Sequence, residues 1–201
     1  MRIVAGKFRR RKLLSRSGLD TRPIPDRVKE MLFARLEDEV LDARVADIFA
    51  GTGTIGLEAL SRGARSVVFV EKDRRAFELL RKNVASLGVQ EQCLCWCTDV
   101  LHSSLRPKGV EPMLPYDVVF VDPPFDLIGE LKLRGRLYRP MLRLARDTIS
   151  SSSALLILRT PRRADFQMPE VWQPVDPIRL NNMEIHLFRK AKDSNEEVTS
   201  S

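Results

Sequence analysis

The sequence predicts an α/β fold built on a mostly parallel, seven-stranded sheet with helices on both faces. The first observation is that short apolar runs alternate with helical patterns between residues 45 and 158. A chain that alternates in this way forms a parallel sheet with right-handed crossovers. The second observation is a pair of apolar runs after residue 170 with no helical pattern between them. These two runs predict an antiparallel strand pair at the C-terminal end.

The first 36 residues predict a hairpin or an extended arm followed by one helix. Residues 1–17 alternate loosely between apolar and charged side chains around Gly6. Residues 17–25 are rich in turn formers, and their prolines disfavour a helix. The dipeptide Pro25-Asp26 can open a helix, and apolar side chains follow at helical spacing from Val28 to Leu36.

Each further strand is predicted from an apolar run, and each helix from apolar residues that recur every three or four positions. The predicted strands are residues 45–50, 66–70, 92–96, 117–121, 153–158, 171–178 and 183–189. The predicted helices are residues 56–62, residues 74–87 and one around residues 137–144. We therefore divide the chain into a basic N-terminal segment (1–36), a sheet domain (37–190) and a polar tail (191–201) that we expect to be disordered.

The composition fits a single globular domain. Of 201 residues, 43% are apolar, which is enough for one substantial core, and no run of about 18 apolar residues predicts a membrane span. The N-terminus lacks the apolar run of a signal peptide, so we expect a cytoplasmic protein. Cys93, Cys95 and Cys97 lie too close together for a disulfide framework, and their spacing along a strand predicts buried thiols on one face. With only His102 and His186 elsewhere, we expect no metal site.

Positive charge is concentrated near the N-terminus. The whole chain carries +7, but residues 1–36 hold eleven basic and three acidic side chains. This segment alone therefore carries +8, and the other 165 residues carry −1. A nearly neutral domain with a cationic extension is typical of proteins that bind nucleic acids. A solvated basic surface that only improves solubility is the alternative.

A glycine-rich turn follows the first predicted strand of the sheet. Gly51, Gly53 and Gly56 form the pattern G-x-G-x-x-G, the turn opens a helix, and Glu71 ends the next predicted strand. These are the conditions for a dinucleotide-binding fingerprint, in which the glycines bring the backbone close to the ligand and the acid accepts hydrogen bonds from ribose hydroxyls. A tight turn without a ligand would show the same glycines.

Acidic side chains favour a cationic ligand over a dinucleotide. Asp47 lies four residues before the first glycine, where it would repel a pyrophosphate, and Glu71 and Asp99 follow the next two strands. The carboxyl edge of an open sheet, where these three acids would line up, is where ligands bind. S-adenosylmethionine carries a sulfonium and an ammonium group and has no pyrophosphate. The acids are therefore candidates to hold its methionine part directly or through water, its ribose hydroxyls and its adenine amine.

The fourth predicted strand ends in Asp122-Pro123-Pro124-Phe125. The prolines have no backbone N–H, so the turn offers mainly carbonyl acceptors, to which Asp122 adds a carboxylate. Together these groups can hold both hydrogens of an exocyclic amine while Phe125 stacks on the attached ring. Such hydrogen bonds orient the amine for an in-line displacement at a sulfonium methyl group, with Asp122 as the candidate proton acceptor. A rigid turn without a ligand is the alternative.

The combined motifs resemble the amino-methyltransferases of nucleic acids, whose fourth motif has Asp, Asn or Ser before two prolines and an aromatic residue. More specifically, residues 1–126 resemble the bacterial 16S ribosomal RNA guanine-N2 methyltransferase family (RsmD type). The segments that carry the resemblance are residues 1–13, 21–23, 26–33, 47–56, 58–64 and 70–73. The resemblance implies the S-adenosylmethionine-dependent methyltransferase (Rossmann-like) fold.

The resemblance also implies methyl transfer from S-adenosylmethionine to the N2 amine of a guanine in small-subunit ribosomal RNA. The expected partner is this RNA or a partly assembled small ribosomal subunit, and we expect a monomer. The implied cofactor-binding residues are Asp47, Phe49, Gly51, Gly53, Glu71, Lys72 and Asp99. The implied catalytic residues are Asp122, Pro123, Pro124 and Phe125, and the implied RNA contacts are Arg9, Arg10, Arg11, Lys12 and Arg22.

Two positions and one segment depart from the family pattern. Phe125 replaces the commoner Tyr, which keeps the stacking surface and removes a hydroxyl group. Arg159 follows the fifth predicted strand, where the family pattern leads us to expect an acid. Residues 181–186 differ from the glycine-containing ending that the family pattern predicts.

Three other functions remain open from the sequence. A DNA adenine-N6 methyltransferase would use the same Asp-Pro-Pro-Phe chemistry, although 201 residues leave little room for a separate sequence-reading domain. A nicotinamide-dependent oxidoreductase would account for the glycine turn and leave residues 122–125 unexplained. A non-catalytic RNA-binding module would account only for the basic segment.

Overall fold

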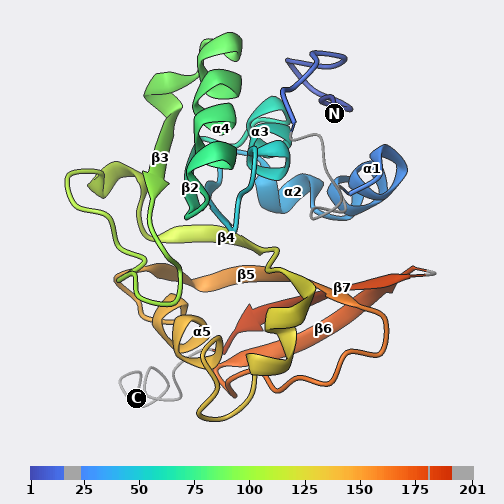
Figure 1. Cartoon of the computed structure of the whole chain (residues 1–201), viewed down its shortest axis with the longest axis vertical. Helices are drawn as coiled ribbons and strands as arrows, with labels where there is room; N and C mark the ends of the chain where they lie inside the picture. Colours follow the sequence, from blue (N-terminus) through green and yellow to red (C-terminus); the bar gives the residue numbers. More distant parts are fainter. Residues whose placement is uncertain (16–23, 181, 192–201) are drawn as a thin grey trace, which may run out of the picture.

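The computed structural model describes residues 1–15, 24–180 and 182–191, and its centre is a single seven-stranded sheet (Figure 1). The strands are β1 (Arg44–Ile48), β2 (Ser66–Glu71), β3 (Cys93–Cys97), β4 (Tyr116–Val121), β5 (Ser150–Pro161), β6 (Trp172–Arg179) and β7 (Met183–Lys190). They lie in the order β3-β2-β1-β4-β5-β7-β6. β1 to β5 are parallel, and β7 is antiparallel to both β5 and β6. The predicted sheet with its antiparallel C-terminal pair is confirmed.

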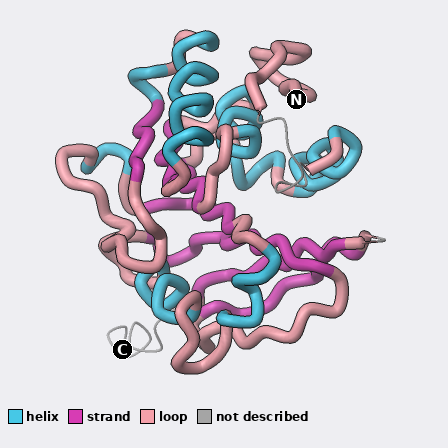
Figure 2. The backbone as a smooth tube through the Cα atoms, in the orientation of Figure 1, coloured by secondary structure: helices cyan, strands magenta, loops and turns pink. Residues whose placement is uncertain are grey.

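Helices cover both faces of this sheet (Figure 2). The α-helices are α1 (Asp26–Arg35), α2 (Glu37–Val40), α3 (Thr54–Ser61), α4 (Arg74–Leu87) and α5 (Tyr138–Leu144), and the 3₁₀ helices are η1 (Gln90–Gln92), η2 (Glu111–Met113) and η3 (Phe125–Glu130). Val45 and Val67 pack in the core shared with α1 to α4, whereas their neighbours Ala46 and Val68 pack in the core shared with η3 and α5. Successive side chains of a strand point to opposite faces, so a sheet covered on both faces needs such continuous apolar runs.

Local signals set the bounds of α4, which match the prediction. The side chain of Asp73 caps its start by accepting a hydrogen bond from the N–H of Ala76 at 2.8 Å. Gly88 ends it in a left-handed conformation with φ of 69°, as helix ends commonly do. β5 is longer than predicted, because pairing with Tyr116 extends its start and pairing with Met183 extends its end.

The prediction of three buried thiols is wrong. Cys93 and Cys95 are half-buried and Cys97 is exposed. β3 is an edge strand of the sheet and has only one neighbouring strand, β2, so its side chains are less covered than those of the central strands.

Residues 1–13 form a small hairpin, called here the N-terminal hairpin. Arg2 and Lys12 pair as an antiparallel bridge, and the N–H of Ile3 donates to the carbonyl of Arg11 at 3.0 Å. Ile3 and Leu13 are buried in the same core as α1. The division of the chain at residue 36 stays a prediction, and Arg22 and the tail after residue 191 lie outside the described residues. Within the described part of the chain, every helix is too short or too polar to span a bilayer.

Candidate active site

The parallel strands bring the predicted cofactor residues to the carboxyl edge of the sheet. β1 leads into the glycine turn, in which Phe49, Gly51 and Gly53 have φ of 65°, 56° and 81°. A Cβ at Gly53 would lie 2.4 Å from the Cδ1 of Leu80, so a larger residue there would displace the Leu80 side chain and would be strained at this positive φ. A Cβ at Gly51 would meet no atom within 4 Å, so the turn borders open space at this point.

Asp47 lies one residue before the end of β1, and its side chain is buried beneath the start of α3. It is 2% exposed, and its Oδ2 accepts a hydrogen bond from the N–H of Gly56 at 2.9 Å. Burial raises the pKa of Asp47 to about 8, the negative charges of Asp122 and Glu71 add to the rise, and the N–H of Gly56 opposes it. A nearby cation would lower this pKa and restore the ionised form.

Glu71 ends β2 and closes the glycine turn. Its Oε2 accepts from the N–H of Gly51 at 2.8 Å, and its Oε1 accepts from the N–H of Asp73 at 2.7 Å. Asp99 follows β3 at the same edge, where its Oδ2 lies 3.6 Å from the Nζ of Lys72. The structure therefore brings the sequence-predicted cofactor residues together around one turn.

This set of side chains fits S-adenosylmethionine better than a dinucleotide. Glu71 and Asp122 lie close enough to Asp47 for their negative charges to raise its pKa. A sulfonium or ammonium group would relieve that repulsion, whereas a pyrophosphate would increase it. Each carboxylate oxygen of Glu71 holds one backbone N–H and keeps a further lone pair for a hydroxyl donor.

The predicted acceptor turn follows β4, which pairs with β1. The N–H of Asp122 donates to the carbonyl of Ile48 at 3.1 Å and so ties the turn to the end of β1. The Oδ1 of Asp122 accepts a hydrogen bond from the Nε of Arg159 at 2.6 Å. Burial raises the pKa of the Asp122 carboxyl, and the charge and hydrogen bond of Arg159 lower it.

Phe125 begins η3, where its ring is half-buried. The Cζ of Arg159 lies 5.6 Å from the centroid of this ring. A small apolar cavity adjoins Asp122 and is lined in part by Leu32 of α1 and Ile55 of α3. The predicted catalytic residues therefore gather at one place, and α1 reaches it.

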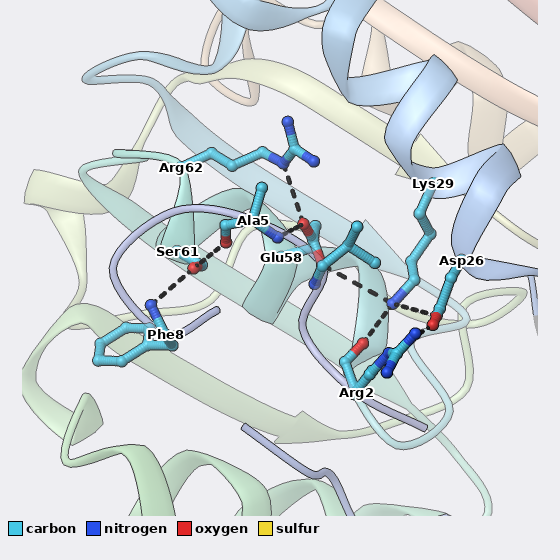
Figure 3. Close-up of polar contacts among 9 residues, drawn as sticks. Arg2, Ala5, Phe8, Asp26, Lys29, Glu58, Ser61 and Arg62 are labelled. Atoms are coloured by element: carbon cyan, nitrogen blue, oxygen red, sulfur yellow. Dashed lines mark hydrogen bonds and ion pairs between the residues drawn. The ribbon is translucent and has the colours of Figure 1, made fainter. Parts of the chain in front are cut away.

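A buried polar cluster fixes the N-terminal hairpin to α1 and α3 (Figure 3). Glu58 of α3 is fully buried, and its carboxylate accepts from the N–H groups of Val4 at 2.7 Å and Ala5 at 3.0 Å. The Nε of Arg62 donates to the same carboxylate at 3.0 Å, and the Nζ of Lys29 lies 3.7 Å from it. The negative charge of Glu58 is thus balanced by two cations and two backbone donors.

Lys29 connects this cluster to the start of the hairpin. Its side chain is 2% exposed, and its Nζ donates to the carbonyl of Arg2 at 2.6 Å. The Nε of Arg2 donates to Asp26, also of α1, at 2.8 Å. On α3, the hydroxyl of Ser61 accepts from the N–H of Phe8 at 2.9 Å. These contacts hold the first strand and the turn of the hairpin.

Asn83 of α4 joins the end of the hairpin to the glycine turn. Its Oδ1 accepts from the N–H of Leu14 at 2.7 Å. Its Nδ2 donates to the carbonyl of Leu14 at 3.0 Å and to the carbonyl of Thr52 at 2.9 Å. One buried amide therefore contacts both the basic segment and the proposed cofactor turn.

The predicted RNA contacts Arg9, Arg10, Arg11 and Lys12 are exposed on the hairpin, away from the carboxyl edge (Figure 1). The Nη2 of Arg11 donates to the carbonyl of Ser86 near the end of α4 at 2.7 Å, whereas the start of α4, at Arg74, lies near the carboxyl edge. The separation of Arg74 and Ser86 corresponds to about 18 Å along the helix. The structure does not bring these RNA contacts together with the catalytic residues.

Sequence reasoning missed three residues that the structure places in these networks. Arg159 carried a signal, because it is basic where the family pattern has an acid. Glu58 carried a weaker one, since it is an acid in the otherwise apolar run from Ile55 to Leu60. Asn83 lies in a polar stretch of α4 and carried none.

Comparison with known proteins identifies the family. The family model described as Conserved hypothetical protein 95 matches residues 1–189. The ribosomal RNA small subunit methyltransferase D of Haemophilus influenzae is 33% identical over 176 residues, which cover 86% of this chain and 84% of the relative. The chain belongs to this methyltransferase D family. The protein of the same name from Escherichia coli K12 is 39% identical over 125 residues, 62% of this chain, and the match spans 60% of that relative's length.

Solved structures of methyltransferases share the fold of this chain. The "Putative methyltransferase yhhF from Escherichia coli" is 31% identical, with a TM-score of 0.78 over 95% of this chain and 98% of the other. An RNA methyltransferase from Salinibacter ruber, solved with S-adenosyl-L-homocysteine, is 19% identical, with a TM-score of 0.61 over 89% of this chain and 99% of the other. At that identity the likeness concerns the fold alone. The predicted α/β methyltransferase fold is confirmed.

Proposed function

We propose that the protein transfers a methyl group from S-adenosylmethionine to the N2 amine of a guanine in small-subunit ribosomal RNA. The proposal rests on the backbone hydrogen bond from the N–H of Asp122 to the carbonyl of Ile48. This bond fixes the amine-acceptor turn beside β1, the strand that leads into the glycine turn. The substrate class follows from membership in the methyltransferase D family, whose relatives bear the name small subunit methyltransferase. The choice of N2 follows from the resemblance of residues 1–126 to the guanine-N2 enzymes.

The carboxyl edge binds the cofactor, which when bound supplies a sulfonium methyl group as the electrophile. Asp47 offsets the positive charge of the methionine part, and Glu71 accepts hydrogen bonds from the ribose hydroxyls. Asp99, held near Lys72, accepts from the adenine amine. The positive φ of Gly51 lets the backbone approach the ligand without a side chain in the way.

The acceptor turn binds the target base. The carboxylate of Asp122 and the carbonyl of Pro123 accept the two hydrogens of the amine, and Phe125 stacks on the guanine ring. The nitrogen would gain the methyl group as the bond between that methyl and the sulfonium sulfur breaks, and it would lose one proton, which Asp122 accepts. Burial raises the pKa of Asp122, and a stronger base accepts this proton more readily.

The N-terminal hairpin contacts the RNA backbone at a distance from the target nucleotide. Arg9, Arg10 and Lys12 are exposed and supply phosphate contacts beside the end of α4, which Arg11 contacts at Ser86. The target base must be unpaired to present its amine, so we expect a loop or an incompletely folded region as substrate. Within this proposal the protein acts as a cytoplasmic monomer on ribosomal RNA or on a partly assembled small subunit.

Transfer of a tritiated methyl group tests the proposal. The wild-type protein should label 16S ribosomal RNA or partly assembled small subunits, and nucleoside mass spectrometry should identify N2-methylguanosine. Asp122→Ala should lower the transfer rate by at least about 100-fold while cofactor binding by calorimetry is kept. Asp126→Ala, which removes an exposed acid of η3, is the matched control and should retain the wild-type rate.

Three outcomes would contradict the proposal. Methylated adenine in DNA, with no label in RNA, would point to the adenine-N6 alternative. Binding of NAD in place of S-adenosylmethionine would point to an oxidoreductase. Full activity of Asp122→Ala would remove the proposed role of the acceptor turn.

A further inference from the structure

Arg159 contacts both functional side chains of the acceptor turn. β4 and β5 pair in register up to Val121 and Leu158, so Asp122 and Arg159 follow at the next position. The Nε of Arg159 donates to the Oδ1 of Asp122 at 2.6 Å, and its Cζ lies 5.6 Å from the ring centroid of Phe125. One guanidinium group therefore supports both the proposed proton acceptor and the proposed stacking ring.

This ion pair lies in sheltered, apolar surroundings. The side chain of Arg159 is 12% exposed and that of Asp122 is 22% exposed. The other elements that border the adjoining cavity contribute apolar side chains, including Leu32 of α1, Ile55 of α3 and Ile185 of β7. Charges in such a position are weakly screened, so the loss of one strongly affects the other.

Arg159 opposes the effect of burial on Asp122 and so favours the ionised form of its carboxyl group. The carboxyl group of Asp47 lies on the neighbouring strand β1, and Arg159 is the one cation among the described residues that line the cavity. Burial by itself favours the neutral carboxyl group, which would direct a proton donor at the target amine where an acceptor is needed.

The hydrogen bond also makes the two oxygens of Asp122 inequivalent. Oδ1 is held by Arg159, so within the described residues Oδ2 is the oxygen with its full acceptor capacity. A carboxylate held at one oxygen cannot rotate freely, and the direction in which it presents the other oxygen is fixed. Methyl transfer depends on such orientation, because the amine must be aligned with the bond that breaks.

We propose that Arg159 is a positioning residue for methyl transfer, which keeps Asp122 ionised and oriented toward the target amine and supports the ring of Phe125. This inference rests on the proposed function. It gives a role to a position at which the chain has a basic residue and the family pattern has an acid.

The first test is the pH profile of single-turnover methyl transfer. Arg159→Met should lower the rate about 10- to 100-fold and move the acid limb of the profile to higher pH, because Asp122 then binds a proton more readily. Arg159→Lys should keep most of the wild-type rate and should leave the acid limb close to its wild-type pH. Arg162→Met, which removes an exposed cation from the connection after β5, is the matched control and should leave both unchanged.

The second test is a double-mutant cycle with Asp122→Asn. The loss caused by Arg159→Met should be clearly smaller in the Asp122→Asn background than in the wild-type protein, because only the support of the Phe125 ring then remains to be lost. A purely structural role would lower the rate equally in both backgrounds. Cofactor binding by calorimetry and the melting temperature are measured for every variant. If Arg159→Met does not fold, Arg159→Gln is judged by the same shift of the acid limb.

Two results would overturn the inference. The first is a wild-type rate and pH profile for Arg159→Met, and the second is an undiminished loss in the Asp122→Asn background. Failure of the proposed function is seen separately, because the wild-type protein would then methylate no RNA at any pH.

Discussion

Among single residues, Asp47 shows how the carboxyl edge concentrates negative charge. In the folded protein burial and two neighbouring acids raise its pKa from 3.8 to about 8. The unfolded chain therefore loses this proton at a lower pH than the folded protein does. The contribution of Asp47 to stability is fully present below about pH 4 and is lost as the pH rises to about 8. In the ligand-free protein the ionised carboxylate of Asp47 is therefore destabilising near pH 8, and a cationic ligand would stabilise it.

We predict that S-adenosylmethionine binds more tightly as the pH rises from about 6 to about 8, and that binding releases protons. A bound cation lowers the pKa of Asp47, so in this range the carboxyl group loses its proton on binding. Titration calorimetry in two buffers with different ionisation enthalpies measures both effects. Asp47→Asn should weaken binding, abolish the pH dependence and raise the melting temperature of the ligand-free protein at pH 8. Constant affinity and no proton release between pH 6 and 9 would argue against this role.

At the scale of elements, buried charge connects the N-terminal hairpin to the methyltransferase fold. Lys29 of α1 and Glu58 of α3 are 2% and 0% exposed, and each binds backbone groups of the hairpin. Buried ion pairs of this kind add little net stability when complete, but they are costly to break because one charge is left without its partner. The hairpin therefore behaves as an integral element of the fold.

We predict that Glu58→Gln lowers the free energy of unfolding by about 3 kcal/mol, because Lys29 loses its buried carboxylate partner and one backbone donor loses a charged acceptor. Urea denaturation measures the change. Hydrogen exchange of the amides of Val4 and Ala5 should accelerate at the same time. Glu78→Gln on α4, which breaks an exposed pair with Arg81, is the control and should have no measurable effect. Unchanged stability and unchanged exchange would show that the cluster does not hold the hairpin.

At the scale of the whole molecule, Arg11 of the basic hairpin contacts the end of α4, whereas the start of α4 follows β2 at the carboxyl edge (Figure 1). The end of the hairpin nevertheless reaches the glycine turn through Asn83, which bonds both Leu14 and Thr52. A second basic stretch, residues 132–146, contains six basic side chains and no acid. It follows η3 and includes α5, which packs on the other face of the sheet. The contribution of the hairpin to RNA binding can therefore be compared with the effect of removing the same number of charges from residues 132–146.

We predict that replacing Arg9, Arg10 and Lys12 together by Gln weakens RNA binding uniformly across sequences and reduces the salt dependence of binding by about two to three counterions. Fluorescence anisotropy at several salt concentrations measures the slope. Lys132, Arg134 and Arg139 replaced by Gln form the matched control, since they are exposed and carry the same charge. Equal loss from both sets would indicate a general charge effect and not a contact made by the hairpin.

The sequence was sufficient for features that short segments encode and insufficient for contacts between distant segments. The alternation of apolar runs predicted the sheet, and the glycine turn and the Asp-Pro-Pro-Phe turn are each contained in ten residues or fewer. By contrast, Asp122 and Arg159 are 37 residues apart, Glu58 and Val4 are 54 apart, and Asn83 and Leu14 are 69 apart. Those pairs depend on strand register and helix packing, which no local pattern records. The cysteines of β3 were wrongly predicted for the same reason, since edge or centre position depends on the order of strands.

The amide of Asn83 limits how this protein can be dissected. Because it bonds both Leu14 and the carbonyl of Thr52, a truncated protein that begins at residue 15 would lose the partners of Asn83 and of Glu58 together. Such a deletion would disturb the glycine turn and would also remove the positive charge of the hairpin. Point substitutions on the exposed side of the hairpin are therefore the sound way to separate affinity for RNA from turnover.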